Sequence, residues 1–588
     1  MQRVMGRMRR AALVGMAVLG ATAPAALART EAPLTTPPGP FADVARSLVT
    51  IDAPLPSGAP AHPAACDQLR YERFRRAGGP TDPQQADAIF VAMPGILGGA
   101  GSMRMNALGV VQQAAERGRS VEVWALDRRS NCLEDRFGLD AALAAKDPAL
   151  ALDYYFGRKE VAGRRFGGFL KNGQVAVAKS FDLRQTVEDY RAVIVEGVPD
   201  PDVRARKVFC GGHSLGGSIT GQLMAWDFDG DPATTDDAGY KLCRASVALD
   251  SAVTADPSGL GETPLQSEAA AAAGATTYDT VTAFVDRSLR VLDVGVIGPE
   301  TIGTLLGVGV VAQLRPDEDT ADLVARIPTR GAAEQGLRLF HSRTLADTIA
   351  PVATLRRQHL TGEALLGAFL DDDTQPLGFI RTSVGVYANG PVGRKTISQD
   401  GPLVFPTSTS ALYRWANFDD PLPAFPKPNG GVYSTPQSEV TDIQDLARVL
   451  GDGPLEFAEE YFPTRLVTDI NFSQAGTRAG DLRRVQYLGG PAARPRLTVL
   501  AEDGVTDGTP PPLRGADVAL TVPGYDHLDV VTASPKQNDG QPEKVAKAVV
   551  DFMLGLAGSE STATAADRSG AASDATVARR IAALQREG

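Results

Sequence analysis

The sequence predicts an α/β protein with a mostly parallel sheet, and three observations support this fold class. Stretches with the period of a strand alternate with stretches that have the period of a helix. Residues 88–93 form an uninterrupted apolar run, as expected for a strand that helices cover on both faces. A glycine-rich segment at 211–217 joins a strand pattern to a helix pattern. Repeated β-α-β units of this kind place parallel strands in one sheet.

Local patterns give the elements in order. Residues 68–76 alternate like a strand, and the apolar run 88–93 ends at Pro94-Gly95. The next helix is expected to be capped by Ser102 and to end at Gly118. Further strands are expected at 121–126, 207–210, 245–249 and 496–501, and further helices at 182–195, 218–226 and 545–556.

Both ends of the chain differ in composition from the rest. Four arginines precede an apolar stretch and an A-x-A pattern at 26–28, and these are the three parts of an export signal. Cleavage near Ala28 would place the mature protein outside the cytoplasm, in a periplasmic or extracellular space where disulfides form. Residues 558–588 are rich in Ala, Ser, Thr and Asp, which predicts a disordered tail.

Composition and charge exclude several classes of protein. The 588 residues include 59 basic and 70 acidic side chains, and this net charge of −11 argues against a nucleic-acid-binding protein with a broad basic face. Removal of residues 1–28 takes away four arginines and no acid, which makes the net charge −15. No later segment is long and apolar enough to span a membrane. Residues 227–231 resemble the start of a calcium loop, but Pro232 replaces its glycine, and we expect no metal and no cofactor.

A candidate nucleophile lies in the glycine-rich segment Gly211-Gly212-His213-Ser214-Leu215-Gly216-Gly217. This segment contains G-x-S-x-G with Ser214 at its centre, between a strand and a helix. Glycines at 212 and 216 suit a tight turn that holds the serine hydroxyl clear of the sheet. We therefore expect Ser214 to be the nucleophile of an enzyme.

A serine nucleophile needs a general base, and the chain has five histidines. His62 lies in a Pro/Ala segment, His213 is fixed beside the serine, and His341 and His359 lie in Arg-containing helical stretches. His527 differs because it follows a strand-like run and a turn and precedes an amphipathic helix. A histidine in the loop after the last strand can reach the serine, which predicts His527 as the base.

These motifs resemble those of the α/β-hydrolase superfamily. The stretch Gly-His-Ser-Leu-Gly-Gly at 212–217 is similar to that of its lipases and esterases, and Gly-Tyr-Asp-His-Leu-Asp at 524–529 is similar to their late histidine motif. The order Ser, then acid, then His also fits. The resemblance covers residues 88–250 and 491–556 and implies the α/β-hydrolase fold.

Three aspartates are candidates for the acid that orients the histidine. Asp503 lies where the predicted strand 496–501 ends, in the loop in which the superfamily usually carries its acid, and it is preferred. Asp507 is second, because Gly504-x-x-Asp507-x-x-x-Pro511 is similar to a spacing found in many relatives. Asp250 is third, because some lipases take the acid from the strand after the nucleophile.

Acyl transfer also requires N–H donors for the developing oxyanion. The resemblance implies that the backbone N–H of Leu215, next to the nucleophile, is the first donor. It places the second donor in the loop 94–99, with Ile96 as the preferred residue. Relatives often have His-Gly at this point, whereas this chain has Pro94-Gly95.

The four cysteines test the expected fold. If residues 68–76 are its antiparallel second strand, their start lies at the same sheet edge as the end of 121–126, and Cys66 and Cys132 can form a disulfide. Cys210 and Cys243 are expected at the end of one parallel strand and the start of the next, too far apart for a bridge, and are predicted to stay reduced.

The predicted domain organisation is one catalytic fold that is split by an insertion. Residues 1–28 form the signal, 29–250 and 491–557 the two parts of the core, 251–490 a mainly helical cap, and 558–588 the tail. Insertions at loop ends of such sheets commonly shape pockets. Substrate identity would then depend on the cap.

The expected function is that of a secreted serine hydrolase that cleaves carboxylic esters through an acyl-enzyme. The substrate would be a small-molecule or lipid-like ester, whose acyl preference these residues do not specify, and the oligomeric state is not predicted. Two alternatives use the same fold: an acyltransferase or amidase/peptidase with the same triad, and a binding protein without turnover. The intact serine and histidine motifs disfavour the binding protein.

Overall fold

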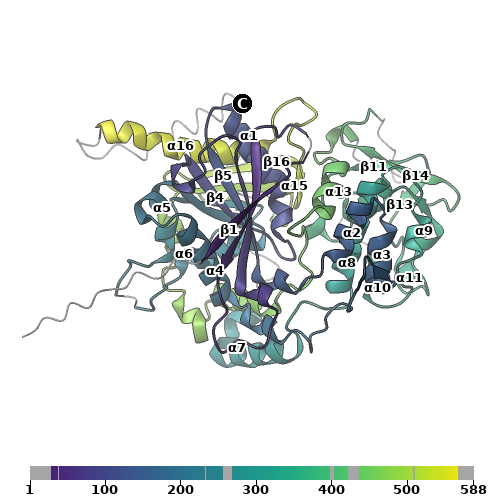
Figure 1. Ribbon diagram of the computed structural model, residues 1–588, viewed down its shortest axis with the longest axis horizontal. Coiled ribbons are helices and arrows are strands. Elements are labelled where there is room, and N and C mark those ends of the chain that lie inside the picture. The colour runs from purple at the N-terminus through teal and green to yellow at the C-terminus, as the bar shows by residue number, and fades with distance from the viewer. Residues whose placement is uncertain are drawn as a thin grey trace, which may run out of the picture.

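The computed structural model describes residues 28–37, 39–231, 233–255, 268–397, 403–421, 436–506 and 510–566. Figure 1 shows a twisted sheet with helices on both faces and, beside it, a second lobe made mainly of helices. Residues 1–27 of the predicted signal, Asp507, and the tail after Ala566 lie outside the described residues. Within the described ranges, no helix is both long and apolar enough to cross a bilayer.

The central sheet has nine strands among the described residues, in the order β1-β2-β3-β5-β4-β8-β9-β15-β16. The six strands from β5 to β16 in this order run parallel, and β1, β2 and β3 add antiparallel pairs at one edge. Their bounds are β1 Arg29–Leu34, β2 Val44–Asp52, β3 Gln68–Arg76, β4 Ala88–Met93, β5 Val121–Asp127, β8 Val208–His213, β9 Ala245–Leu249, β15 Arg496–Asp503 and β16 Val518–Asp526.

Helices cover both faces of this sheet. Helices α1 (Arg104–Glu116) and α16 (Lys544–Ala566) contact each other over one face, while α4 (Leu183–Gly197) and α6 (Leu215–Ala225) contact each other over the other (Figure 1). Every residue of β4 is therefore buried, as its apolar run predicts. The parallel strands, crossover helices and turn after β8 confirm the predicted class, an α/β-hydrolase fold. α16 continues to Ala566, so that residues 558–566, which were predicted to belong to the disordered tail, are helical.

The second lobe is built around α8 (Pro299–Leu314), an almost wholly apolar helix. It contacts α2 (Phe137–Ala145), α3 (Ala149–Tyr155), α10 (Ala332–Phe340), α12 (Gly362–Leu370) and α13 (Ile443–Gly451). Close packing requires small residues here, because a Cβ at Gly309 would lie 2.5 Å from the Leu450 Cβ. Helices α2 and α3 thus lie with the insertion although they precede β8 in the sequence.

Shorter elements complete the molecule. Helix α14 (Thr464–Gln474) contacts α7 (Glu268–Ser288), α4 and α6, on the α4 side of the sheet. The remaining bounds are α5 Pro201–Lys207, α9 Ala321–Val324, α11 Leu345–Thr348, α15 Asp529–Thr532, β6 Glu160–Val161, β7 Arg164–Arg165, β10 His359–Leu360, β11 Gly385–Ala388, β12 Val392–Arg394, β13 Val404–Pro406 and β14 Leu412–Asn417.

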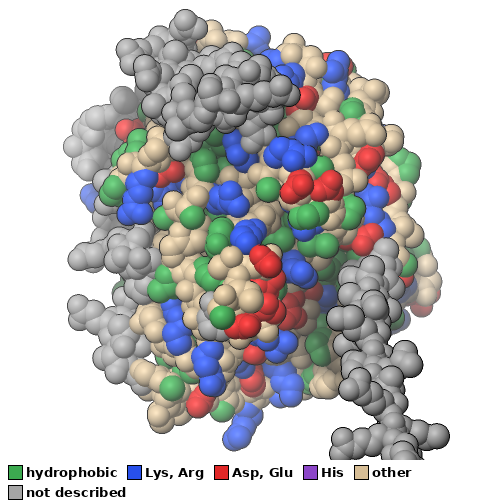
Figure 2. All heavy atoms as spheres, turned by 90° about the vertical axis from the view of Figure 1, so that its left-hand side faces the viewer, with side chains coloured by type: hydrophobic (Ala, Val, Ile, Leu, Met, Phe, Trp, Pro, Cys, Tyr) green, Lys and Arg blue, Asp and Glu red, His purple; other side chains and the backbone are tan. Residues whose placement is uncertain are grey.

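The surface at the left of Figure 1 carries charges of both signs. Figure 2 shows this face with lysine and arginine side chains interspersed among aspartate and glutamate side chains. Such a mixture of charges is common on protein surfaces.

Two disulfides occur among the described residues, one predicted and one not. Cys66–Cys132 has a Cα–Cα distance of 5.0 Å and confirms the expected pairing. Cys210–Cys243, with a Cα–Cα distance of 5.8 Å, shows that the prediction of two reduced thiols is wrong. The prediction placed Cys210 at a strand end, but it lies inside β8. A 3-10 turn, Gly239–Leu242, packs on α6 before β9, so that Cys243 does not extend the strand and lies beside Cys210.

Candidate active site

Ser214 lies in a sharp turn between β8 and α6. Its φ of 52° and ψ of −124° are strained for a residue with a side chain. A Cβ at Gly212 or at Gly216 would overlap the carbonyl oxygen of Met93, so that only glycine fits on either side of the turn. The Ser214 N–H donates to Leu249 O at 3.0 Å, which fixes the turn to β9. This geometry is that of a nucleophile elbow.

His527 follows directly after β16, at the same edge of the sheet, and is buried. Its Nδ1 lies 2.5 Å from Oδ2 of Asp250, the residue after β9. The Asp250 carboxylate also accepts from Val505 N at 3.1 Å and from Thr506 Oγ1 at 3.0 Å. Burial alone would raise the pKa of Asp250, but its hydrogen bond to His527 and the positive charge that His527 can carry lower the pKa overall.

The structure places Asp250, not the preferred Asp503, against the imidazole. Asp503 ends β15 but is exposed, and burial of part of its side chain raises its pKa above the ordinary range. The register of β15 on β16 shifts between Ala501 and Asp503, and Asp503 pairs with Asp526, the residue before His527. The following loop packs on Asp250, since a Cβ at Gly504 would overlap its carboxylate. The described part of this loop, residues 504–506, therefore supplies N–H and O–H donors to the Asp250 carboxylate.

The loop expected to hold the oxyanion donors lies against the nucleophile. A Cβ at Gly95 would be 3.0 Å from the Ser214 Cβ, so the absence of a side chain at Gly95 permits this approach. Ile96 is half-buried and lines the same cavity as Ser214 and His527. Leu215 is the first residue of α6, where backbone N–H groups have no partner within the helix. Both predicted donor residues are thus at the site.

The cavity beside Ser214 and His527 has mainly apolar walls and a volume of about 850 Å³, which includes the open solvent at its mouth. One wall comes from the loop after β4, and the opposite walls come from α8, α10 and α12 and from the segment 377–380. The apolar residues that line it include Ile302, Leu305, Phe340, Phe369, Leu377 and Phe379. Elements of the insertion therefore enclose the two candidate catalytic residues.

His213 has a role that the sequence did not reveal. Its Nε2 lies 2.9 Å from the backbone oxygen of His527, and the two rings are 4.4 Å apart. Burial, and then the nearby His527, lower the pKa of His213 to about 3, so this ring is neutral. A neutral His213 must donate its Nε2–H to that carbonyl. His213 therefore fixes the backbone of the loop that carries His527.

Two groups of carboxylates in the described ranges lie close enough to share a cation. The first, Asp227, Asp229 and Asp237, is near the surface, and its side chains accept turn N–H groups. The second, Asp371, Asp372 and Glu439, is in the second lobe, where burial raises the pKa of each. Raised pKa values favour neutral acids that share protons. Neither group contributes to the walls of the cavity at Ser214.

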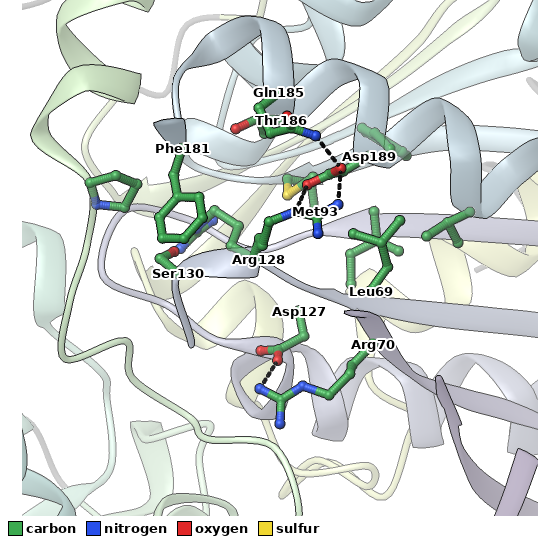
Figure 3. Close-up of a pocket in the computed structure, with 15 residues that line it drawn as sticks. Leu69, Arg70, Met93, Asp127, Arg128, Ser130, Phe181, Gln185, Thr186 and Asp189 are labelled. Carbon is green, nitrogen blue, oxygen red and sulfur yellow. Dashed lines mark hydrogen bonds and ion pairs between the residues drawn. The ribbon is translucent and has the colours of Figure 1, made fainter. Parts of the chain in front are cut away.

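A smaller cavity lies between β5 and α4 (Figure 3), with a volume of about 460 Å³ that includes open solvent. Its charged side chains are paired, with Arg70 2.8 Å from Asp127 and Arg129 2.5 Å from Asp189. Figure 3 also shows Arg128 and Ser130 beside this cavity, in the segment that follows β5.

Comparisons with known proteins assign no activity to this chain. No family model and no curated protein match the sequence. An α/β-hydrolase fold protein from Nakamurella multipartita is 11% identical, with 84% of this chain and 97% of that chain covered and a TM-score of 0.23. A lipase in its open form is 11% identical, with coverages of 90% and 99% and a TM-score of 0.27. A peroxisomal α/β-hydrolase from Saccharomyces cerevisiae is 10% identical, with coverages of 90% and 89% and a TM-score of 0.29. Such low scores support no assignment of activity.

Proposed function

We propose that this protein is a serine hydrolase that cleaves carboxylic esters, with Ser214 as nucleophile, His527 as general base and Asp250 as the acid. One observation carries the proposal: the buried contact between His527 Nδ1 and Asp250 Oδ2, on a ring that lines one cavity with the strained Ser214. A histidine whose Nδ1–H is held by a carboxylate presents Nε2 as a base.

In the proposed reaction, His527 removes the Ser214 proton while the serine oxygen attacks the ester carbonyl. The N–H groups of Leu215 and Ile96 stabilise the oxyanion of the tetrahedral intermediate. His527 then protonates the leaving alcohol, and an acyl-enzyme remains on Ser214. A water molecule, activated by the same histidine, releases the acid and restores the enzyme.

The cavity supports a substrate with an apolar acyl or alcohol group. Its walls contain phenylalanine, leucine and isoleucine side chains, and burial of each CH₂ group of a substrate contributes about 0.8 kcal/mol. Because α8, α10 and α12 supply these walls, we assign the insertion as a cap that selects the substrate. The two disulfides are compatible with the proposed export of the protein.

The test is hydrolysis of aryl esters of increasing acyl length by the wild type and by Ser214→Ala. We expect turnover by the wild type, a preference for acyl chains longer than acetyl, and loss of turnover in the variant. Equal rates for the two proteins would refute the proposal. Addition of an alcohol or amine acceptor during turnover distinguishes hydrolysis from acyl transfer, because a transferase would form a new ester or amide.

A further inference from the structure

One buried arginine binds the loop that faces Ser214. Arg128 follows β5 and is 5% exposed. Its guanidinium donates to the carbonyl oxygens of Pro94 and Gly95, each at 2.8 Å, and to that of Gly98. Residues 94–98 are called the oxyanion loop below. Three of the five carbonyl groups of the oxyanion loop therefore point toward the Arg128 side chain. Figure 3 shows this side chain next to Ser130.

The arginine is itself held by a residue of the insertion. Arg128 Nε donates to Glu459 at 2.7 Å, and Ser130 Oγ donates to the same carboxylate, which is fully buried. The backbone N–H of Glu459 donates to Leu97 O at 2.7 Å, so that a fourth carbonyl of the oxyanion loop is bound. An ion pair without solvent access is costly to break, because the remaining charge would be left buried.

The backbone of the insertion also pairs with this loop. Gly98 forms an antiparallel bridge with Ala458, and Gly99 N donates to Phe457 O at 2.9 Å. Gly101 N donates to Glu456 O at 2.8 Å. Residues 456–459, called the cap segment below, therefore lie along the oxyanion loop and its continuation like a short extra strand.

Peptide geometry connects these contacts with catalysis. In a trans peptide, the carbonyl of one residue and the N–H of the next point in opposite directions. The Gly95–Ile96 peptide is trans, and its carbonyl points to Arg128, so the Ile96 N–H points away from Arg128. Gly95 lies against Ser214, and Ile96 lines the cavity. The side of this peptide that faces away from Arg128, and that carries the Ile96 N–H, is therefore the side of the nucleophile.

We propose that Arg128, held by Glu459, is a positioning residue that keeps the Ile96 N–H directed at the oxyanion of the Ser214 reaction. This inference rests on the proposed function. A guanidinium suits the task because its donors form a rigid planar fork that can bind several carbonyl groups at once. A lysine at this position would keep the charge but would not reproduce the fork.

The test compares Arg128→Met and Arg128→Lys with Arg129→Met as a matched control. Arg129 is the next residue, is 7% exposed, pairs with Asp189, and donates to the carbonyls of Ala53 and Cys66, each at 2.7 Å. It contacts no residue of the oxyanion loop through these bonds. The control therefore removes a buried arginine that is also ion-paired and bonded to carbonyl groups, but outside the oxyanion loop.

Two readouts separate positioning from general damage. The first is kcat and KM for an aryl ester. The second is the affinity for a trifluoromethyl ketone, compared with that for the corresponding secondary alcohol. Serine adds to the ketone carbon, its proton passes to His527, and the carbonyl oxygen becomes a bound oxyanion. The alcohol forms no such oxyanion.

We expect Arg128→Met to lower kcat and ketone affinity by ~100-fold or more, the effect of losing one oxyanion donor. KM and alcohol affinity should stay within ~3-fold of the wild type, since ground-state binding is not removed. Arg128→Lys should recover only part of the loss, and Arg129→Met should leave the ratio of the two affinities unchanged. Equal losses in both Met variants, or a change in KM alone, would overturn the proposal.

Hydrogen exchange gives a readout that needs no turnover. Backbone amides in residues 93–101 should exchange faster in Arg128→Met and in Glu459→Gln than in the wild type, and unchanged exchange would also overturn the proposal. If Arg128→Met does not fold, Glu459→Gln serves for all measurements because it keeps the side-chain shape. A wild type with neither turnover nor a ketone adduct refutes the proposed function, while the exchange data still decide whether Arg128 holds the loop.

Discussion

Replacement of Asp250 by asparagine tests the proposed triad most directly. The Asp250 carboxylate is fully buried and 2.5 Å from His527 Nδ1, so water cannot take its place. Three further donors, the Ala501 and Val505 N–H groups and the Thr506 hydroxyl, also face the carboxylate. An asparagine would have to turn its NH₂ group toward a donor or toward His527. If the NH₂ group faces His527, the His527 Nδ1 must accept its hydrogen bond. The ring proton then lies on Nε2, and the ring cannot act as the base.

The expected loss is large because it combines a wrong tautomer with a lost charge. Removal of a triad carboxylate in this way lowers kcat by ~10⁴-fold, which corresponds to about 5.5 kcal/mol of transition-state free energy. The assay is aryl ester hydrolysis by Asp250→Asn, with Asp503→Asn as the matched control. Asp503 is exposed and should change kcat by less than ~3-fold. Thermal unfolding of both variants checks that they fold.

A larger loss in Asp503→Asn than in Asp250→Asn would refute the reasoning, because the acid would then act from the end of β15. Equal losses in both variants would also refute it, since the contact at Asp250 would have no special importance.

Three further predictions concern stability and specificity. Burial, and then the nearby Asp372, raise the pKa of Asp526 to about 10, so the folded state keeps a proton that the unfolded chain has lost above pH ~4. The free energy of unfolding should fall as pH rises toward 10, by up to about 1.4 kcal/mol per pH unit, and urea titrations of Asp526→Asn should show a smaller fall. Replacement of Cys66 and Cys132 by alanine opens a loop of sequence separation 66 and should lower the free energy of unfolding by about 2–5 kcal/mol in urea titrations. An unchanged free energy of unfolding would contradict this prediction. Leu305→Trp narrows the cavity and should lower kcat/KM for a long acyl ester by ~10-fold relative to the acetyl ester. Equal changes in kcat/KM for both esters would show that the acyl chain binds elsewhere.

The sequence predicted the parts of the site that depend on local patterns. Ser214 and His527 are each defined by a turn with a strand before it and a helix after it, and such signals lie within about ten neighbouring residues. The acid could not be chosen in this way. Asp250 follows β9 and Asp503 ends β15, so both lie at one edge of the sheet, and the contact of Asp250 with His527 Nδ1 distinguishes them.

Contacts between distant segments account for the rest of what was missed. The bridge between Cys210 and Cys243 depends on how the 3-10 turn before β9 packs on α6. The contact between Arg128 and Glu459 joins residues 331 positions apart, and neither residue belongs to a recognisable motif. An arginine after a strand and a glutamate in a loop resemble ordinary surface charges until the fold brings them together.

The pairing of the cap segment with the oxyanion loop has a consequence for how the chain could be redesigned or shortened. A shortened chain that joined Asp250 directly to β15 would keep Ser214, Asp250 and His527 in the sheet. It would lose the partners of Leu97, Gly99 and Gly101, and the buried Arg128 would have no counter-ion. The proposed cap would therefore not be a detachable module that only chooses substrates. Under the proposed function, the element added to the fold would belong to the smallest part of the chain that can carry out the reaction.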